Sequence, residues 1–205
     1  MKKILFLALI VAAFIGCSKS SDDPKENGIP ASYYKLSEDG LTLLKWEDTN
    51  TTSLDMQADS KLQKVNTIAA NAFRDSKVEN ITLPNNLKEI GDYAFINSRL
   101  HTITFNTSSS VTFGQAVFED TQLVSVKLPN TKEIPASSFS GCVNLKEVQF
   151  GKTEKIGERA FRGCVALTQI NLDNTTLTEI GERAFAGCEN VEKVILPSTI
   201  KKIDK

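Results

Sequence analysis

The sequence has few of the residues that most catalytic and metal sites use. Its 205 residues include one histidine, His101, and two methionines, one of which is the initiator. It also lacks an excess of either charge, since 24 Lys and Arg face 25 Asp and Glu. Without a basic excess to neutralise phosphates, a general nucleic-acid binder is disfavoured. The apolar content of 40% and charged content of 24% are ordinary for a globular chain and argue against complete disorder.

No apolar run is long enough to span a membrane, which needs roughly 18 residues or more. The longest run, residues 4–15, contains twelve residues and as a helix would span only about 18 Å. It follows Lys2 and Lys3 and precedes Gly16 and Cys17, the order of a secretory signal peptide. Residues 1–16 are therefore predicted to be a cleaved leader.

The segment Phe14-Ile15-Gly16-Cys17 resembles a bacterial lipobox, with Phe14 where leucine is usual. The resemblance implies lipidation at Cys17, with cleavage before it and acylation of the new amino group. An ordinary secretory signal with a chance cysteine is the alternative. Residues 17–31 are polar and without a period, which predicts a flexible tether. Ser18 and the acidic residues 22–23 resemble signals that sort lipoproteins to the outer membrane and its exterior face.

From residue 62 onward the chain is a repeat with a period of about 22 residues. Its most regular residue is a phenylalanine, found at Phe73, Phe95, Phe118, Phe139, Phe161 and Phe185. An apolar residue stands five positions before each phenylalanine, and an apolar-x-x-apolar-x-apolar run follows it. A unit of this length cannot bury its own apolar face, so neighbouring units must stack as a solenoid. The alternating run predicts a short strand and hence a parallel sheet, and the segment around each phenylalanine suits a single helical turn.

The units resemble the BspA-type bacterial leucine-rich repeats. The resemblance rests on runs such as KEIGDYAFINSRLHTITF (88–105) and EKIGERAFRGCVALTQINL (154–172), and it covers residues 62–203. It implies an α/β solenoid, a right-handed superhelix with a parallel sheet of short strands and short helical turns. It also implies a cell-surface, often lipid-anchored protein that binds proteins or cells, with no catalytic residue to carry over. The third unit departs most, at residues 113–118, and the fourth has Pro135 where glycine is usual, but neither changes the spacing.

Residues 32–61 do not fit the repeat. Residues 33–36 and 41–46 predict a hairpin with Asp39-Gly40 in its turn, and residues 52–56 a further strand. We interpret this segment as a small β cap on the repeat domain of six units at 62–205, with a separate small domain as the alternative. At the other end, Ile200 and Ile203 begin a seventh unit. Its strand is shielded either by the nearby lysines or by a docked partner.

Three cysteines, Cys142, Cys164 and Cys188, recur with the repeat. Each lies three residues before the first apolar residue of the predicted strand, the position that holds Asp75, Asn97 and Asp120 in the first three units. This shared position and the wide spacing predict a stacked row of free thiols and not a disulfide or a metal site. His101 is expected on the sheet surface, without a catalytic partner. The Glu-Arg pairs at 158–159 and 182–183 are expected to stack as a solvated lattice of ion pairs, with a charged docking patch as the alternative.

The function indicated is a lipid-anchored cell-surface binding protein, an adhesin or a protein-interaction scaffold, that uses the sheet face of its repeats. A carbohydrate-capture accessory lipoprotein is the alternative. The sequence indicates no enzymatic activity and no cofactor, metal, nucleic acid or small-molecule substrate. The protein is expected to contact the membrane through its lipid anchor only. The expected partner is a protein on a host or bacterial surface. Lys127, Lys146 and Gln149, near the centre of the sheet, are the candidate binding residues.

Overall fold

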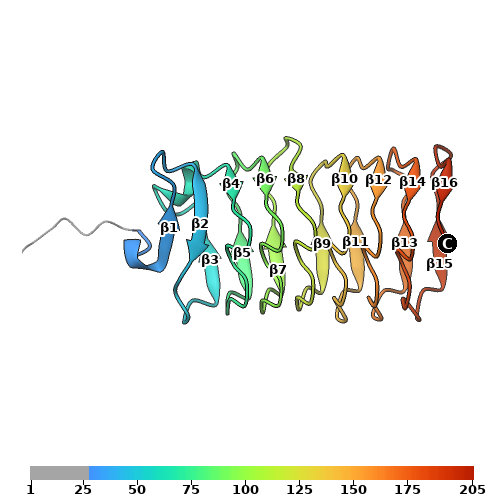
Figure 1. The fold of residues 1–205 in the computed structure, drawn as a ribbon, viewed down its shortest axis with the longest axis horizontal. Coiled ribbons are helices and arrows are strands. Elements are labelled where there is room, and N and C mark those ends of the chain that lie inside the picture. Colours follow the sequence, from blue (N-terminus) through green and yellow to red (C-terminus); the bar gives the residue numbers. More distant parts are fainter. Residues whose placement is uncertain (1–27) are drawn as a thin grey trace, which may run out of the picture.

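The computed structural model, which describes residues 28–205, is a β-solenoid of about seven turns. Each turn contributes strands to two rows that run side by side along the solenoid axis (Figure 1). The predicted solenoid with parallel strands is therefore confirmed. The predicted leader, Cys17 and most of the tether lie outside the described residues.

The rows differ in strand length. The short-strand row consists of β2 (Thr42–Trp46), β4 (Thr67–Ile68), β6 (Glu89–Ile90), β8 (Thr112–Phe113), β10 (Glu133–Ile134), β12 (Lys155–Ile156), β14 (Glu179–Ile180) and β16 (Lys202–Ile203). The long-strand row consists of β3 (Ser53–Asp55), β5 (Asn80–Thr82), β7 (Thr102–Thr104), β9 (Ser125–Lys127), β11 (Glu147–Gln149), β13 (Gln169–Asn171) and β15 (Lys193–Ile195). The sequence pattern predicted the long-strand row. It did not predict the short-strand row, although the apolar residue five positions before each phenylalanine lies in it.

The long strands alternate as their sequences require. In β13, the side chain of Ile170 points inward and is buried, whereas Gln169 and Asn171 are exposed. The same pattern of an inward middle residue between two outward neighbours holds in β5, β7 and β9. Because the pleat has a period of two, one apolar residue per strand is enough to fix which face points to the core.

The third side of each turn, which we call the turn face, surrounds the repeated phenylalanine. In the first such segment Asn71, Phe73 and Asp75 donate their backbone N–H groups to carbonyls of the next turn, while Arg74 donates to Asn71 within its own turn. Asn71 and Asp75 have φ angles of 59° and 57°, in the left-handed region. This alternation replaces the helical turn that the sequence predicted, because a helix would direct successive N–H groups back along the same segment. The helical segments among the described residues are two short 3-10 turns, η1 (Ala31–Tyr33) and η2 (Leu62–Lys64).

Stacked aromatic rings form the centre of the core. We call this the phenylalanine stack; it runs through Trp46, Phe73, Phe95, Phe118, Phe139, Phe161 and Phe185. Successive ring centroids lie 4.8–5.9 Å apart, close to the spacing of paired strands. The predicted interior position of the repeated phenylalanine is thus confirmed.

The short-strand row is interrupted once, between β8 and β10. In the next turn Gly157 donates its N–H to the carbonyl of Ile134 at 2.8 Å. Pro135 occupies the equivalent position one turn earlier, and proline has no N–H to donate. The repeat spacing is kept at Pro135, as predicted, but the strand pairing is not.

The long-strand row is interrupted between β7 and β9 and again between β11 and β13. We call these two gaps seams. The strands before them are followed by Phe105 and Phe150, which are half-buried, where Leu83, Leu128 and Leu172 are buried after other strands. A phenyl ring is larger than the isobutyl group that this position otherwise holds, and close-packed interiors respond to such a change by moving apart.

Residues 34–55 form the first turn of the solenoid. The predicted hairpin is present: β1 (Tyr34–Leu36) pairs antiparallel with β2, and Gly40 in its turn has a φ of 71°. Strands β2 and β3 then pair in parallel with β4 and β5. The ring of Tyr34 stacks at 6.4 Å on Trp46, which begins the phenylalanine stack. The hairpin therefore adds one more layer to the core at this end.

Candidate functional site

The exposed side of the long-strand row, which we call the strand face, presents lines of polar side chains. The strands pair in register, so that Ser125 lies beside Glu147 and Lys127 beside Gln149. In the N-terminal turns Asn80 lies beside Thr102 in the same way, and their side chains are hydrogen-bonded. Paired strands hold such neighbours about 4.8 Å apart, so each line is a regular series of chemical groups.

The three candidate binding residues fall within one paired segment of this face. Lys127 ends β9 and Gln149 ends β11, while Lys146 stands one residue before β11 and donates its N–H to the carbonyl of Val124 at 2.8 Å. All three side chains are exposed. Gln149 also donates its side-chain amide to Glu147 at 2.9 Å. The structure therefore brings the three residues onto one surface, at the middle of the described solenoid.

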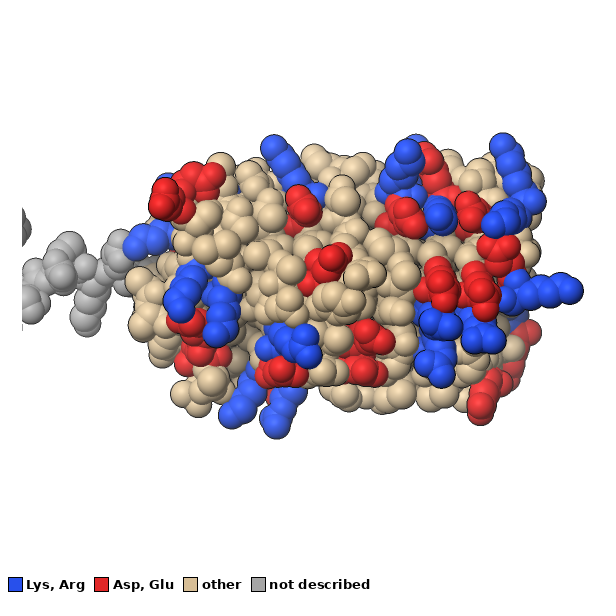
Figure 2. Space-filling model, viewed as in Figure 1, with Lys and Arg blue, Asp and Glu red and all other residues tan. Residues whose placement is uncertain are grey.

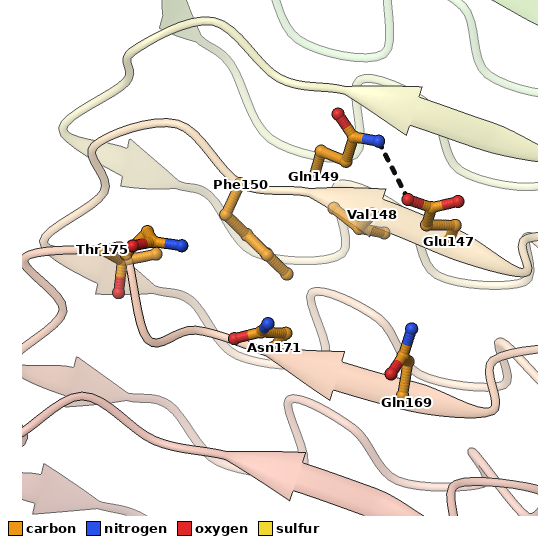
Figure 3. Close-up of a pocket in the computed structure, with 8 residues that line it drawn as sticks. Glu147, Val148, Gln149, Phe150, Gln169, Asn171 and Thr175 are labelled. Carbon is orange, nitrogen blue, oxygen red and sulfur yellow. Dashed lines mark hydrogen bonds between the residues drawn. The ribbon is translucent and has the colours of Figure 1, made fainter.

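A cavity of about 290 Å³, which we call the seam pocket, opens at the second seam. It is lined by Glu147, Val148, Gln149, Phe150, Gln169, Asn171, Asn174 and Thr175. Figure 3 shows the Phe150 ring lying between β11 and β13, with Asn171 opposite it. Val148 is half-buried, although the equivalent Val126 and Ile170 are 3% and 5% exposed, so the seam uncovers part of the interior.

Sequence reasoning missed this pocket. Its signal is the change from leucine to phenylalanine at residue 150, together with a longer loop beyond the next strand. Seven residues separate β13 from β14, against five between β11 and β12, and this loop supplies Asn174 and Thr175. Both differences are visible in the printed sequence, but pairing between strands is needed to see that they adjoin.

The three repeat cysteines are free thiols that bond to the preceding turn. Cys142 donates its Sγ hydrogen to the carbonyl of Phe118 and Cys164 to that of Phe139, each at 3.1 Å. Burial raises the pKa of the Cys142 thiol to about 11 and also raises that of Cys164. Because the thiolate is the reactive form, these groups are suited to packing rather than to chemistry.

The predicted position of these cysteines is wrong by one residue. Their backbone N–H groups bond within the turn as those of Ser76, Ser98 and Thr121 do, so the thiols share the position of these hydroxyl residues. Asp75, Asn97 and Asp120 instead match Gly141, Gly163 and Gly187, all with positive φ. Counting back from the strand gave the wrong position because the unit length differs. The last three units have one more residue between this hydroxyl or thiol position and the first apolar strand residue than the first three units have.

The remaining candidates for chemistry are dispersed. His101 is exposed at the start of the strand face, as predicted, and donates its backbone N–H to Glu79. Within residues 28–205 no group of three or more His, Cys, Asp or Glu is placed to hold a metal ion. In the same part of the chain, no helix has the length and apolar character needed to cross a bilayer.

Charged residues form small mixed groups rather than a field of one sign. Figure 2 shows groups of both signs toward both ends of the face in view, with fewer charged side chains between them. Glu158 pairs with Arg159 at 3.0 Å, and Glu182 with Arg183 at 3.5 Å. Arg159 donates its backbone N–H to Glu182, so the two pairs occupy successive turns, as predicted. Exposed pairs of this kind contribute at most about 1 kcal/mol each.

A parallel β-solenoid with an aromatic core and polar strand face defines a repeat protein of the leucine-rich repeat class. Residues 47–153 and 132–205 match the BspA-type leucine-rich repeat region, in six copies. The chain therefore belongs to the BspA-type leucine-rich repeat family. Proteins of this family and fold are typically non-enzymatic scaffolds.

Two solved bacterial structures share the fold. A leucine-rich repeat protein from Eubacterium ventriosum matches 88% of this chain and 48% of its own, at 21% identity and a TM-score of 0.69. A leucine-rich cell-surface protein from Faecalibacterium prausnitzii matches 89% of this chain and 56% of its own, at 24% identity and a TM-score of 0.53. The chain thus spans about half the length of these structures. No curated protein is significantly similar in sequence.

Proposed function

We propose that this chain is a lipid-anchored cell-surface binding protein, an adhesin or interaction scaffold, and not an enzyme. Cys17 carries the lipid at the outer membrane, after removal of residues 1–16, and residues 17–31 tether the rest outside the cell. Residues 32–61 cap the repeat domain at 62–205. A protein on a host or bacterial surface binds the strand face at Lys127, Lys146 and Gln149.

The observation that carries this proposal is the in-register strand face. Its side chains stand on backbone held by strand pairing and by the phenylalanine stack. A rigid display lowers the ordering cost of binding, so many modest contacts add up to useful affinity. Lys127, at the end of β9, and Lys146, just before β11, favour a partner with exposed acidic groups.

The test begins with a partner identified by pull-down with the full chain. A variant with Lys127, Lys146 and Gln149 all changed to alanine is expected to lose at least about tenfold in affinity, since truncation of central contacts dominates binding losses. The comparison variant changes Glu158, Arg159 and Arg183 to alanine on the turn face and is expected to bind as the parent does. Loss of binding in the second variant alone would place the site on the turn face.

A further inference from the structure

The seam pocket lies at the second of the two breaks in the long-strand row. β11 pairs with β9 and β13 pairs with β15, but β11 and β13 do not pair with each other. β9 lies beyond β11 and β15 lies beyond β13, so paired strands flank the pocket on both sides. Its volume of about 290 Å³ lies at the lower end of small-molecule sites, which suits a ligand of one or two rings.

Several polar groups of the pocket keep unused hydrogen-bonding capacity. On the β11 side, the bond from Gln149 to Glu147 leaves the amide oxygen of Gln149 and one Glu147 oxygen as acceptors. On the β13 side, Asn171 accepts a bond from the N–H of Asp173 and so retains its NH₂ group as a donor. The side-chain amide of Gln169 has no partner within residues 28–205. The side chains on the β11 side of the pocket therefore accept hydrogen bonds, and those on the β13 side can both donate and accept them.

The charge and shape of the pocket narrow the ligand class. Glu147 is the one charged residue among those lining the pocket, so an anionic ligand would be repelled. Phe150 offers an apolar ring between the two polar walls (Figure 3). A sugar ring has hydroxyls that donate and accept at its edge and apolar C–H groups on its face. An extended peptide adds to a strand edge over several residues, whereas the edges of β11 and β13 that face the pocket are only three residues long.

We propose that the seam pocket binds one neutral saccharide unit. Its hydroxyls donate to Glu147 and Gln149 and accept from Gln169 and Asn171, while its apolar face packs against Phe150. This goes beyond the proposed capture of a protein by the strand face. The amides of Gln169 and Asn171 lie outside the three residues of that proposal, so the two can fail separately.

The experiment titrates the full chain with glucose, galactose, mannose, N-acetylglucosamine and their disaccharides. Glucuronic acid and N-acetylneuraminic acid form an acidic set, and unstructured hexapeptides form a third. Saturation-transfer NMR and calorimetry are expected to detect at least one neutral sugar with a Kd of about 0.1–10 mM, as suits a small open site. Changing Gln169 and Asn171 to alanine should weaken that binding at least about tenfold, since two hydrogen bonds are lost.

Matched variants separate the pocket from general effects on the strand face. Thr102→Ala with Thr104→Ala alters the same positions of β7 and should leave sugar binding unchanged. Phe150→Leu restores the residue found after other strands and should close the seam and abolish binding, whereas Phe105→Leu, at the first seam, should not. Thermal melts check that each variant is folded. The proposal is overturned if no neutral sugar binds at about 50 mM, if acidic sugars or peptides alone bind, or if either pocket variant binds as the parent does.

Discussion

Phe161 is the last ring but one of the phenylalanine stack, between Phe139 at 5.0 Å and Phe185 at 5.2 Å, and Phe150 meets it edge-on at 5.8 Å. It is fully buried. Each such ring contacts the turns on both sides of it, so a single residue contributes to two interfaces. Stability in a solenoid is therefore concentrated at these positions.

We expect Phe161→Ala to lower the free energy of unfolding by about 3–5 kcal/mol, the usual cost of removing a buried aromatic side chain. Denaturant unfolding followed by circular dichroism measures this value. Val143→Ala, at an exposed position of an adjacent turn, is the control and should change it by less than about 0.5 kcal/mol. A Phe161→Ala transition that coincides with that of the parent would mean that the ring contributes nothing to the core.

The thiols should be unreactive until the chain unfolds. Burial raises the pKa of Cys142 to about 11, so its thiolate fraction at pH 8 is far below that of an ordinary cysteine. Ellman titration of a Cys17→Ala chain should detect almost no thiol in native protein and three equivalents in denaturant. Rapid reaction in native protein would show that the cysteines are accessible.

The Sγ bond of Cys164 should matter less than the ring of Phe161. We expect Cys164→Ser to cost about 1–2 kcal/mol, because a more polar hydroxyl replaces the thiol in a fully buried site. Ser98, at the equivalent position of an earlier turn, is already buried without a partner for its hydroxyl, so the site accepts serine. Denaturant unfolding beside Phe161→Ala makes the comparison, and an equal or greater loss for Cys164→Ser would contradict it.

At the residue scale the sequence predicted the inward phenylalanines but not the environment of the cysteines. The phenylalanine recurs at nearly constant spacing, and burial of a large ring leaves little choice of orientation. Cys142 lies in a turn whose length changes by one residue between the first and last three units. Only the backbone bonds, such as Cys142 to Phe139, show which residues are equivalent.

At the scale of elements, each turn is built from two very short strands and a turn face with alternating hydrogen bonds. The alternation apolar-x-apolar predicted the long-strand row, because a pleat with one buried side requires it. After β2, the short-strand row has only two residues per turn, such as Glu89–Ile90, too few for any period to appear in the sequence. Positive φ at residues such as Arg159 and Tyr93 was equally invisible, since these residue types rarely adopt it.

Pro135 provides a test of the interruption in the short-strand row. In Pro135→Gly the new N–H can donate to the carbonyl of Phe113, as Gly157 donates to Ile134. We expect a slowly exchanging amide at residue 135 by hydrogen exchange. The free energy of unfolding should change by no more than about 1 kcal/mol, because the added bond is offset by the greater freedom of glycine in the unfolded chain.

The matched control is Pro84→Gly, in the loop after β5. Pro84 follows Leu83 as Gly151 follows Phe150, and the N–H of Gly151 makes no backbone hydrogen bond within residues 28–205, so replacing Pro84 should create no slowly exchanging amide. If residue 135 in Pro135→Gly exchanges as fast as residue 84 in the control, the missing N–H is not what separates β8 from β10.

At the scale of the whole molecule, the repeat predicted the architecture better than it predicted any surface feature. Stacking of incomplete units follows from the period alone. The seam pocket depends instead on departures from the repeat, at Phe150 and in the loop that carries Asn174. Binding sites on repeat proteins are hard to predict for this reason: the consensus determines the scaffold and the exceptions determine the site.

The membrane attachment in our proposal has a direct test. Cys17→Ala should move the protein from the membrane fraction to the soluble fraction, because the single lipidated residue would be lost. The melting curve of the variant should match that of the parent. Cys164→Ser, which removes a buried thiol from the repeat domain, is the control and should remain with the membrane. Sedimentation of the Cys17→Ala chain with the outer membrane would show that lipid at residue 17 is not the anchor.

The interruptions of the two strand rows never coincide. The long-strand row breaks between the turns of β7 and β9 and of β11 and β13, while the short-strand row breaks only between them, at β8 and β10. The turn-face bonds continue across every one of these boundaries, for example from Phe95 to Val117 and from Phe118 to Ser138. Because the interruptions fall at different boundaries, every pair of successive turns keeps at least one strand ladder as well as the turn-face bonds. A tensile load applied between the two ends would therefore always be carried by at least one intact ladder.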